Sequence, residues 1–214
     1  MQSQFSQIQD AVSCYYDGKI QSGGPTAAGV DWNSEESQTL RFEQLLKIRS
    51  GKAPFSLIDY GCGYGALVSY LEGQVSSFDY QGFDISAQMI AQARHLHQTN
   101  RSCRFFEEES LLVPSDYTVA SGIFNVKLKA HEEEWKQYIL ATLEKINALS
   151  HIGFAFNLLT LYSDPDRMRP DLYYADPSFF FAHCKTQFSK EVALLHDYGL
   201  YEFTLLVRKA GGSR

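Results

Sequence analysis

The amino-acid sequence predicts an α/β fold with a doubly wound, mostly parallel seven-stranded sheet, a terminal antiparallel hairpin and an N-terminal helical cap. Between residues 55 and 161, short apolar runs typical of buried strands alternate with helical stripes. Such alternation is typical of parallel sheets that are covered by helices on both faces. The runs 191–196 and 201–207 are separated only by residues 197–200, which is too short for the crossover that parallel neighbours need. These last two strands are therefore expected to be antiparallel.

Short apolar or alternating runs carry the strand prediction. Each has the length of an ordinary strand, and the run 55–60 leads directly into a cluster of glycines. We expect strands at 55–60, 77–83, 103–106, 117–124, 153–161, 191–196 and 201–207.

Helix boundaries follow from capping signals. Asn33 and Glu36 have the spacing of a capping box, and Ser86 is a good N-cap residue. The segment that begins near Glu132 carries the clearest apolar stripe, and its acidic first turn suits the helix dipole. We expect helices at 4–16, 33–50, 66–71, 86–96 and 132–149.

Composition and charge are those of one domain of ordinary size. The 214 residues are 44% hydrophobic and 14% aromatic, which is enough for a sizeable core and too apolar for a disordered chain. We expect one compact domain in which residues 1–50 form the helical cap and residues 51–214 form the sheet and its helices. The net charge of −6 argues against a nucleic-acid partner, because most domains that bind nucleic acid have a basic surface.

The chain has no pattern typical of a membrane protein or a metal protein. It lacks a run of about eighteen apolar residues, and its N-terminus is polar, unlike a signal peptide. Its cysteines lie far apart, without the spacing of metal ligands, and are expected to be reduced thiols. We therefore expect a cytoplasmic protein with no metal site and no membrane partner, and the sequence indicates no oligomeric state.

The most informative segment is the glycine-rich turn after the run 55–60. Glycine allows a positive φ and brings the backbone within contact distance of a ligand, and the helix that follows offers free N–H groups. An aspartate closes the next strand, where dinucleotide-binding proteins place a carboxylate that accepts hydrogen bonds from ribose hydroxyls. The pattern predicts a nucleotide-type ligand at Asp59, Gly61, Cys62, Gly63, Tyr64, Gly65 and Asp84.

These residues resemble the Rossmann-like, class I S-adenosylmethionine-dependent methyltransferases of small-molecule type. The resemblance covers about residues 30–209 and includes the Asp-x-Gly-x-Gly-x-Gly pattern, the turn at 120–125, the terminal hairpin and the N-terminal helices. It implies a methyltransferase that uses S-adenosylmethionine and releases S-adenosylhomocysteine. It also implies that the donor contacts extend to Trp32, Ile85, Met89, Ser121 and Gly122. Trp32 is expected to be either a lid over the donor or a core anchor for the capping helix.

The acidic residue that often contacts adenine in this family has no clear counterpart. Residues 107–110 crowd the corresponding place, and the pair Glu109 and Ser110 is the favoured assignment.

The same residues are compatible with three interpretations other than methyl transfer. The turn at 61–66 also satisfies the relaxed dinucleotide pattern G-x-G-x-x-[GA], which would suit a nicotinamide-dependent oxidoreductase. That class predicts a catalytic Tyr-x-x-x-Lys or a His/Asp pair in the second half of the chain, and residues 108–214 contain no Tyr-x-x-x-Lys. The glycines could also form a tight turn without a ligand, or the chain could be a catalytically silent accessory module with the same fold.

Methyl transfer from a sulfonium is an in-line displacement on an activated methyl group. The protein must mainly hold the partners in line, and a general base is needed only when the acceptor is protonated. The turn at 121–125 lacks the Asn-Pro-Pro-Tyr run of many enzymes that methylate bases or glutamine. We therefore expect metal-independent transfer to an oxygen or nitrogen atom of a small metabolite. The candidate bases are His131 and Tyr173, followed by His151, His183, His196 and Tyr174.

The segment 162–177 is the expected acceptor site. It follows a strand at the carboxyl edge, where open α/β sheets bind ligands, and long loops in compact domains are usually functional. Its two arginines would pair with a carboxylate or phosphate of an anionic acceptor, unless they are solvated and the tyrosines only pack the loop. The expected acceptor contacts are Phe124, Asn125, Tyr162, Arg167, Arg169 and Tyr174.

Overall fold

The structure is a computed structural model that describes residues 2–26, 34–51 and 53–209. Its strands are β1 (Phe55–Tyr60), β2 (Phe78–Phe83), β3 (Cys103–Phe106), β4 (Ser115–Ala120), β5 (Ser150–Leu159), β6 (Glu191–Leu195) and β7 (Glu202–Arg208). Its helices are α1 (Gln2–Gly23), α2 (Glu35–Leu46), α3 (Ala66–Glu72), α4 (Ala87–Leu96), α5 (Glu132–Ala148) and α6 (Pro177–Gln187), with single 3-10 turns η2 (Glu109–Leu111) and η3 (Pro165–Arg167).

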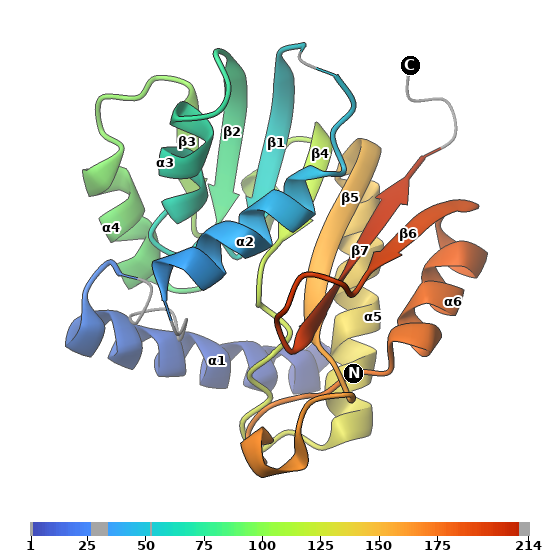
Figure 1. Ribbon diagram of the computed structural model, residues 1–214. Coiled ribbons are helices and arrows are strands. Elements are labelled where there is room, and N and C mark those ends of the chain that lie inside the picture. The colour runs from blue at the N-terminus through green and yellow to red at the C-terminus, as the bar shows by residue number, and fades with distance from the viewer. Residues whose placement is uncertain (1, 27–33, 52, 210–214) are drawn as a thin grey trace.

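All of these strands form one sheet in the order β3-β2-β1-β4-β5-β7-β6 (Figure 1). The pairs among β1 to β5 are parallel, whereas β7 runs antiparallel to both β5 and β6. This arrangement confirms the fold that the sequence predicts. The strand order reverses between β1 and β4, and open α/β sheets bind their ligands at such a switch point.

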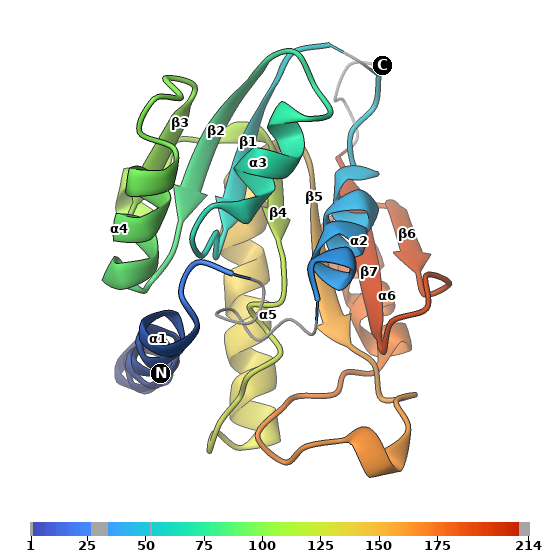
Figure 2. The ribbon, with the colours of Figure 1, turned by 60° about the vertical axis from the view of Figure 1, so that its left-hand side comes forward.

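Helices cover both faces of the sheet (Figure 2). The helices α2, α3 and α4 bury their apolar side chains on one face, and α5 and α6 bury theirs on the other. In the second layer Trp135 is fully buried, and its indole N–H donates to the carbonyl of Phe124 at 2.8 Å. None of the helices in the described part of the chain is long and apolar enough to cross a membrane.

The N-terminal segment divides between two positions. The first helix, α1, is longer than the expected helix 4–16 and lies across the carboxyl ends of β1 and β2 (Figure 1). It buries Ile8, Val12 and Ile20. The second helix, α2, packs on the face of the sheet beside α3 and belongs to the same helical layer. Within residues 1–50, α1 therefore holds the position of a cap and α2 forms part of the core.

Three local predictions differ from the structure. The capping box of α2 is formed by Ser34 and Ser37, not by Glu36 with Asn33, which lies outside the described residues. The strand expected at 117–124 ends at Ala120, because the backbone turns out of the sheet at Gly122, whose φ is 73°. The helix α6 was not predicted, since its sequence PSFFFAHCKTQ has no regular apolar stripe.

The close approach of β5 and β7 can be tested at Gly153. A Cβ atom at this position would lie 2.5 Å from the carbonyl oxygen of Val207 and 3.1 Å from Ile48 Cδ1. We expect Gly153→Ala to lower the free energy of unfolding by about 1–3 kcal/mol, because a backbone shift is needed to fit the methyl group. Urea denaturation measures this change.

The matched control is Gly18→Ala on the exposed side of α1, where nothing lies within 4 Å of the added Cβ. This variant is expected to stabilise the protein by about 0.5–1 kcal/mol, since alanine is the better helix former. Equal stability of the Gly153→Ala variant and the parent protein would contradict the tight packing of β5 on β7.

Candidate functional site

A cleft lies at the carboxyl edge of the sheet, at the ends of β1, β2 and β4. The empty space in it is about 870 Å³, open solvent at its mouth included. The helices α1, α2 and α5 contribute walls to it. It is lined by Val12, Tyr16, Gln38, Phe42, Asp59, Tyr60, Gly61, Cys62, Gly63, Tyr64, Ala66, Phe83, Asp84, Ile85, Met89, Ser121, Gly122, Ile123 and Tyr138.

The glycine turn forms the floor of this cleft between β1 and α3. Gly61, Gly63 and Gly65 have φ values of 83°, 53° and 83°, a backbone region that other residues rarely adopt. A Cβ atom on Gly61 would lie 2.1 Å from Ile123 Cγ2, so this turn also packs directly against the segment after β4. The N–H groups of residues 61 and 62 both donate to the Phe83 carbonyl, at 2.7 and 2.9 Å. The turn is therefore held at the end of β2.

Asp84 joins this turn to the one that follows β2. One of its carboxylate oxygens accepts from the Gly63 N–H and the other from the Ser86 N–H, both at 2.9 Å. Burial raises the pKa of Asp84 to about 6, although both of these hydrogen bonds favour the charged form. A carboxylate has about four acceptor positions, so this group retains acceptor capacity for a ligand.

Asp59 is a second buried carboxylate of the cleft and is only 3% exposed. Burial raises its pKa to about 7; the hydroxyl of Tyr80, which donates to it at 2.7 Å, opposes the shift, and the charge of Asp84 adds to it. Burial and these two carboxylates also raise the pKa of the Cys62 thiol. Cys62 is therefore a packed, unreactive thiol.

Ser121 lines the cleft, and its hydroxyl oxygen is buried without a hydrogen-bond partner among the described residues. Buried polar atoms are almost always hydrogen-bonded in folded proteins, and an exception calls for a ligand or a water. The adjacent Gly122 N–H is held by the Asn157 side chain at 2.7 Å.

The helix α1 is attached to the turn after β2. The Ser13 hydroxyl donates to the Ile85 carbonyl at 3.1 Å, and the Ser86 hydroxyl donates to Asp17 at 2.5 Å. These contacts bring Val12 and Tyr16 to the cleft. Neither residue was predicted from the sequence, because no local pattern indicates which side of a helix will face a ligand.

Most predicted donor contacts lie in this one cleft, but several do not. Gly65 is the N-cap of α3 and shapes the turn without lining the cleft. Glu109 lies behind the wall, where it accepts from the hydroxyl of the cleft residue Tyr60 at 2.5 Å and from Lys145 Nζ at 2.6 Å. Ser110 is exposed and outside the lining, and Trp32 lies outside the described residues.

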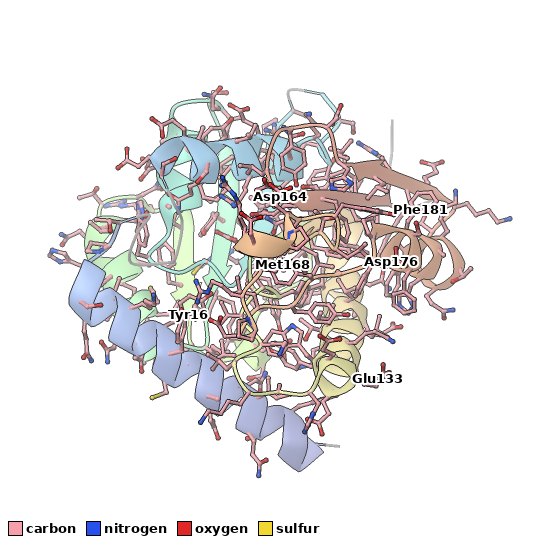
Figure 3. The ribbon with its side chains drawn as sticks, turned by 60° about the horizontal axis from the view of Figure 1, so that its bottom comes forward. Tyr16, Glu133, Asp164, Met168, Asp176 and Phe181 are labelled. Atoms are coloured by element: carbon pink, nitrogen blue, oxygen red, sulfur yellow. The ribbon has the colours of Figure 1, made fainter. Side chains whose placement is uncertain are left out.

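None of the candidate bases lines the cleft, including His151, His183 and His196. His131 is the exposed N-cap of α5. Tyr173 lines a second depression, between the starts of α5 and α6, together with Glu133 and Asp176. In Figure 3 the cleft residue Tyr16 is labelled to the left of these two acidic residues. Burial raises the pKa of Tyr173 to about 12, and nearby carboxylates add to the shift.

Two predicted acceptor contacts are structural. Phe124 is fully buried in the core, where its ring meets that of Phe156 edge-on. The side-chain oxygen of Asn125 accepts from the N–H of Leu159 at 3.3 Å, and the backbone carbonyl of Asn125 accepts from the N–H of Tyr173 at 2.8 Å. The sequence patterns that indicate helices and turns could not show that Phe124 and Asn125 are buried in the core.

The remaining predicted contacts lie on the surface of the segment 162–177. Tyr162 is 66% exposed, and Arg167 is exposed beside the ring of Tyr201. Arg169 is paired with Asp171, and the Tyr174 hydroxyl accepts from the N–H of Arg169 at 3.0 Å. None of these residues lines the cleft.

Comparisons with known proteins agree with a methyltransferase. The family model described as a methyltransferase domain matches residues 57–147. A Mycobacterium tuberculosis protein named "Putative methyltransferase Rv1506c" is 51% identical over 165 residues, which are 77% of this chain and 99% of that protein. This similarity leaves the nicotinamide-dependent and catalytically silent alternatives without support.

Solved structures share the fold at low sequence identity. The magnesium protoporphyrin IX methyltransferase of Synechocystis PCC 6803 with bound S-adenosylmethionine has a TM-score of 0.57 and 16% identity, over 82% of this chain and 80% of that chain. The small RNA methyltransferase HEN1 has a TM-score of 0.58 and 16% identity, over 84% of this chain and 26% of that chain. With the glycine turn, the cleft and these relatives together, the chain belongs to the S-adenosylmethionine-dependent methyltransferases of the Rossmann-like class.

Proposed function

We propose that the protein transfers the methyl group of S-adenosylmethionine to an oxygen or nitrogen atom of a small metabolite, without a metal ion. The observation that carries this proposal is the position of α1 across the carboxyl edge, where it encloses the cleft from one side (Figure 1). A partly enclosed cleft suits a small acceptor better than a polymer.

The charge of the cleft supports the same acceptor class. None of its described lining residues is a lysine or an arginine, whereas nucleic-acid sites use such residues to bind phosphates. The chain as a whole carries a net charge of −6. The similarity to HEN1 is at 16% identity and concerns the fold alone. Since Arg167 and Arg169 lie outside the cleft, the proposal does not require an anionic acceptor.

The donor contacts follow from the groups that face the cleft. We assign the ribose hydroxyls to Asp84, the backbone contacts to residues 61–64 and a polar contact to Ser121. The unpartnered Ser121 hydroxyl fits such a donor, because a ligand atom would satisfy it. Asp59 organises the turn through Tyr80 and places a second acceptor beside the donor.

The chain contributes to the reaction mainly by holding both substrates in place. When bound, S-adenosylmethionine supplies an activated methyl group. The apolar walls from α1, α2 and α5 exclude water, and the fixed turns hold the reacting groups in line, which can contribute several kcal/mol. No group of three or more His, Cys, Asp or Glu side chains in the described ranges has the arrangement of a metal site.

The four cysteines are free thiols in the structure. Unpaired thiols are usual in a reducing compartment, so we place the protein in the cytoplasm.

Methyl transfer in a fractionated extract of Mycobacterium tuberculosis, the organism of the 51% identical relative, tests this function. With methyl-labelled S-adenosylmethionine, we expect label in the small-molecule fraction, attached to oxygen or nitrogen by nuclear magnetic resonance. Excess S-adenosylhomocysteine should abolish the transfer, because it competes for the donor site. Label that enters the RNA or protein fraction instead would contradict the proposed acceptor class.

Removal of the Ser121 hydroxyl should separate ligand binding from stability. We expect Ser121→Ala to weaken S-adenosylhomocysteine binding by about 1–2 kcal/mol, or roughly 5- to 30-fold, since a ligand hydrogen bond is lost. The unliganded protein should be at least as stable as the parent, because an unsatisfied buried atom is removed. Calorimetric titration and thermal unfolding measure the two effects.

The control for this experiment is Ser110→Ala, which changes an exposed serine outside the cleft. Its binding constant should equal that of the parent protein. If Ser110→Ala weakens binding and Ser121→Ala does not, adenine is bound at residues 109–110, as the sequence predicts, and our placement of the donor is wrong.

The raised pKa values of Asp59 and Asp84 give ligand binding and stability opposite pH dependences. Both lie above the ordinary value of 3.8, at about 7 and about 6, so the folded state binds more protons than the unfolded state between pH 4 and 7. Stability of the unliganded protein should therefore fall as pH rises through this window. Affinity for S-adenosylhomocysteine should rise between pH 5.5 and 8, because the hydrogen-bond donors of this ligand bind best to ionised carboxylates.

Calorimetry and urea denaturation at pH 5.5, 6.5 and 8 measure these two trends. In the Asp59→Asn variant, which keeps an acceptor for Tyr80, the fall in stability above pH 6 should be largely removed. An affinity that is constant over this range would place the ligand away from both carboxylates.

A further inference from the structure

A chain of hydrogen bonds runs through the interior from α2 to the turn after β4. Arg41 Nε donates to both carboxylate oxygens of Glu202, at 2.7 and 2.9 Å, and its Nη2 donates to the same group. The Asn157 side-chain NH₂ donates to Glu202 Oε2 at 2.6 Å. The Asn157 oxygen in turn accepts from the N–H of Gly122 at 2.7 Å.

Because this chain of hydrogen bonds is buried, stabilisation of the fold alone does not explain its presence. Glu202 is 1% exposed, Arg41 is 7% exposed and Asn157 is fully buried. Removing two opposite charges from water costs several kcal/mol per ion, and apolar side chains of similar volume often stabilise a fold equally well. The more specific property of a charge pair is that it imposes one orientation on its neighbours.

The charge pair determines how the Asn157 amide is turned. A guanidinium has only donors, and a carboxylate that pairs with it can only accept. The Asn157 NH₂ must therefore face Glu202, which leaves the amide oxygen facing the Gly122 N–H. With the amide reversed, its oxygen would face a carboxylate oxygen of Glu202, and its NH₂ group would face the Gly122 N–H.

The two ends of this chain of hydrogen bonds adjoin two walls of the cleft, the turn after β4 and α2. Gly122 lines the cleft next to Ser121, in the turn after β4. Arg41 lies between Gln38 and Phe42 on α2, and both of these residues line the cleft. This chain of hydrogen bonds crosses β5 at Asn157 and β7 at Glu202, so it connects these walls through the sheet.

We propose that Arg41, Glu202 and Asn157 are positioning residues for methyl transfer, which hold the Ser121–Gly122 turn at a fixed distance from the α2 wall. None of the three lines the cleft, so they act through the turn and through α2 rather than by touching a substrate. This inference rests on the proposed placement of the donor in the cleft.

The variant that tests the network is Glu202→Gln, which keeps the shape of the side chain and removes its charge. A glutamine can both donate and accept, so it no longer dictates the orientation of the Asn157 amide. We expect S-adenosylhomocysteine to bind at least tenfold more weakly, by calorimetry. We also expect the Gly122 amide resonance to move upfield in the ¹⁵N–¹H spectrum of the unliganded variant, because its hydrogen bond is weakened.

A double variant separates positioning from stability. Arg41→Met combined with Glu202→Leu replaces the ion pair by an apolar pair, which is expected to support folding. It should bind S-adenosylhomocysteine as weakly as Glu202→Gln does, since an apolar pair cannot orient the amide. The matched control is Leu205→Val on the same strand, which lies in the opposite core and should lose stability without a change in affinity or in the Gly122 resonance.

The outcomes distinguish this inference from the proposed function. A parent protein that does not bind S-adenosylhomocysteine would contradict the donor site itself. If the parent binds, an unchanged affinity and Gly122 resonance in Glu202→Gln would overturn the positioning role. Parent-like affinity in the double variant would overturn it as well, and so would an equal loss of affinity in Leu205→Val.

Discussion

Two backbone N–H groups, from Gly63 and Ser86, converge on the carboxylate of Asp84 at the carboxyl edge of the sheet. They belong to the turns that follow β1 and β2, so the carboxylate sets the distance between these turns. The Ser86 side chain then binds Asp17, which attaches α1 to the same place. The floor and the cap of the cleft therefore both depend on this one side chain.

The sequence was most informative where a residue type alone restricts the backbone or the chemistry. The glycines at 61, 63 and 65 were predictable because their positive φ values suit few other residues. Asp84 was predictable because dinucleotide-binding proteins place a carboxylate at the end of the second strand. The strands β1 and β3 were located to the residue, since short apolar runs between turns leave little choice of register.

Features that depend on tertiary packing were not predictable in the same way. Val12, Tyr16, Gln38 and Phe42 reach the cleft only because α1 and α2 dock as they do. The chain Arg41–Glu202–Asn157 joins residues that lie far apart in the sequence, and no local pattern indicates such a contact. Conversely, the arginines of segment 162–177 looked functional from their position on a long loop, although no residue of this loop lines the cleft.

The position of β7 between β5 and β6 also affects how the chain can fold while it is being made. The strand β5 is complete before α6, β6 and β7 have been synthesised, so its outer edge lacks its native partner for a time on the order of seconds at usual synthesis rates. This edge belongs to an apolar strand whose residues 153–158 are buried in the finished protein, and unpaired apolar edges are prone to pair with other chains. Residues 202–208 thus complete the sheet, and until they pair with β5 its apolar edge is open to pairing with other chains.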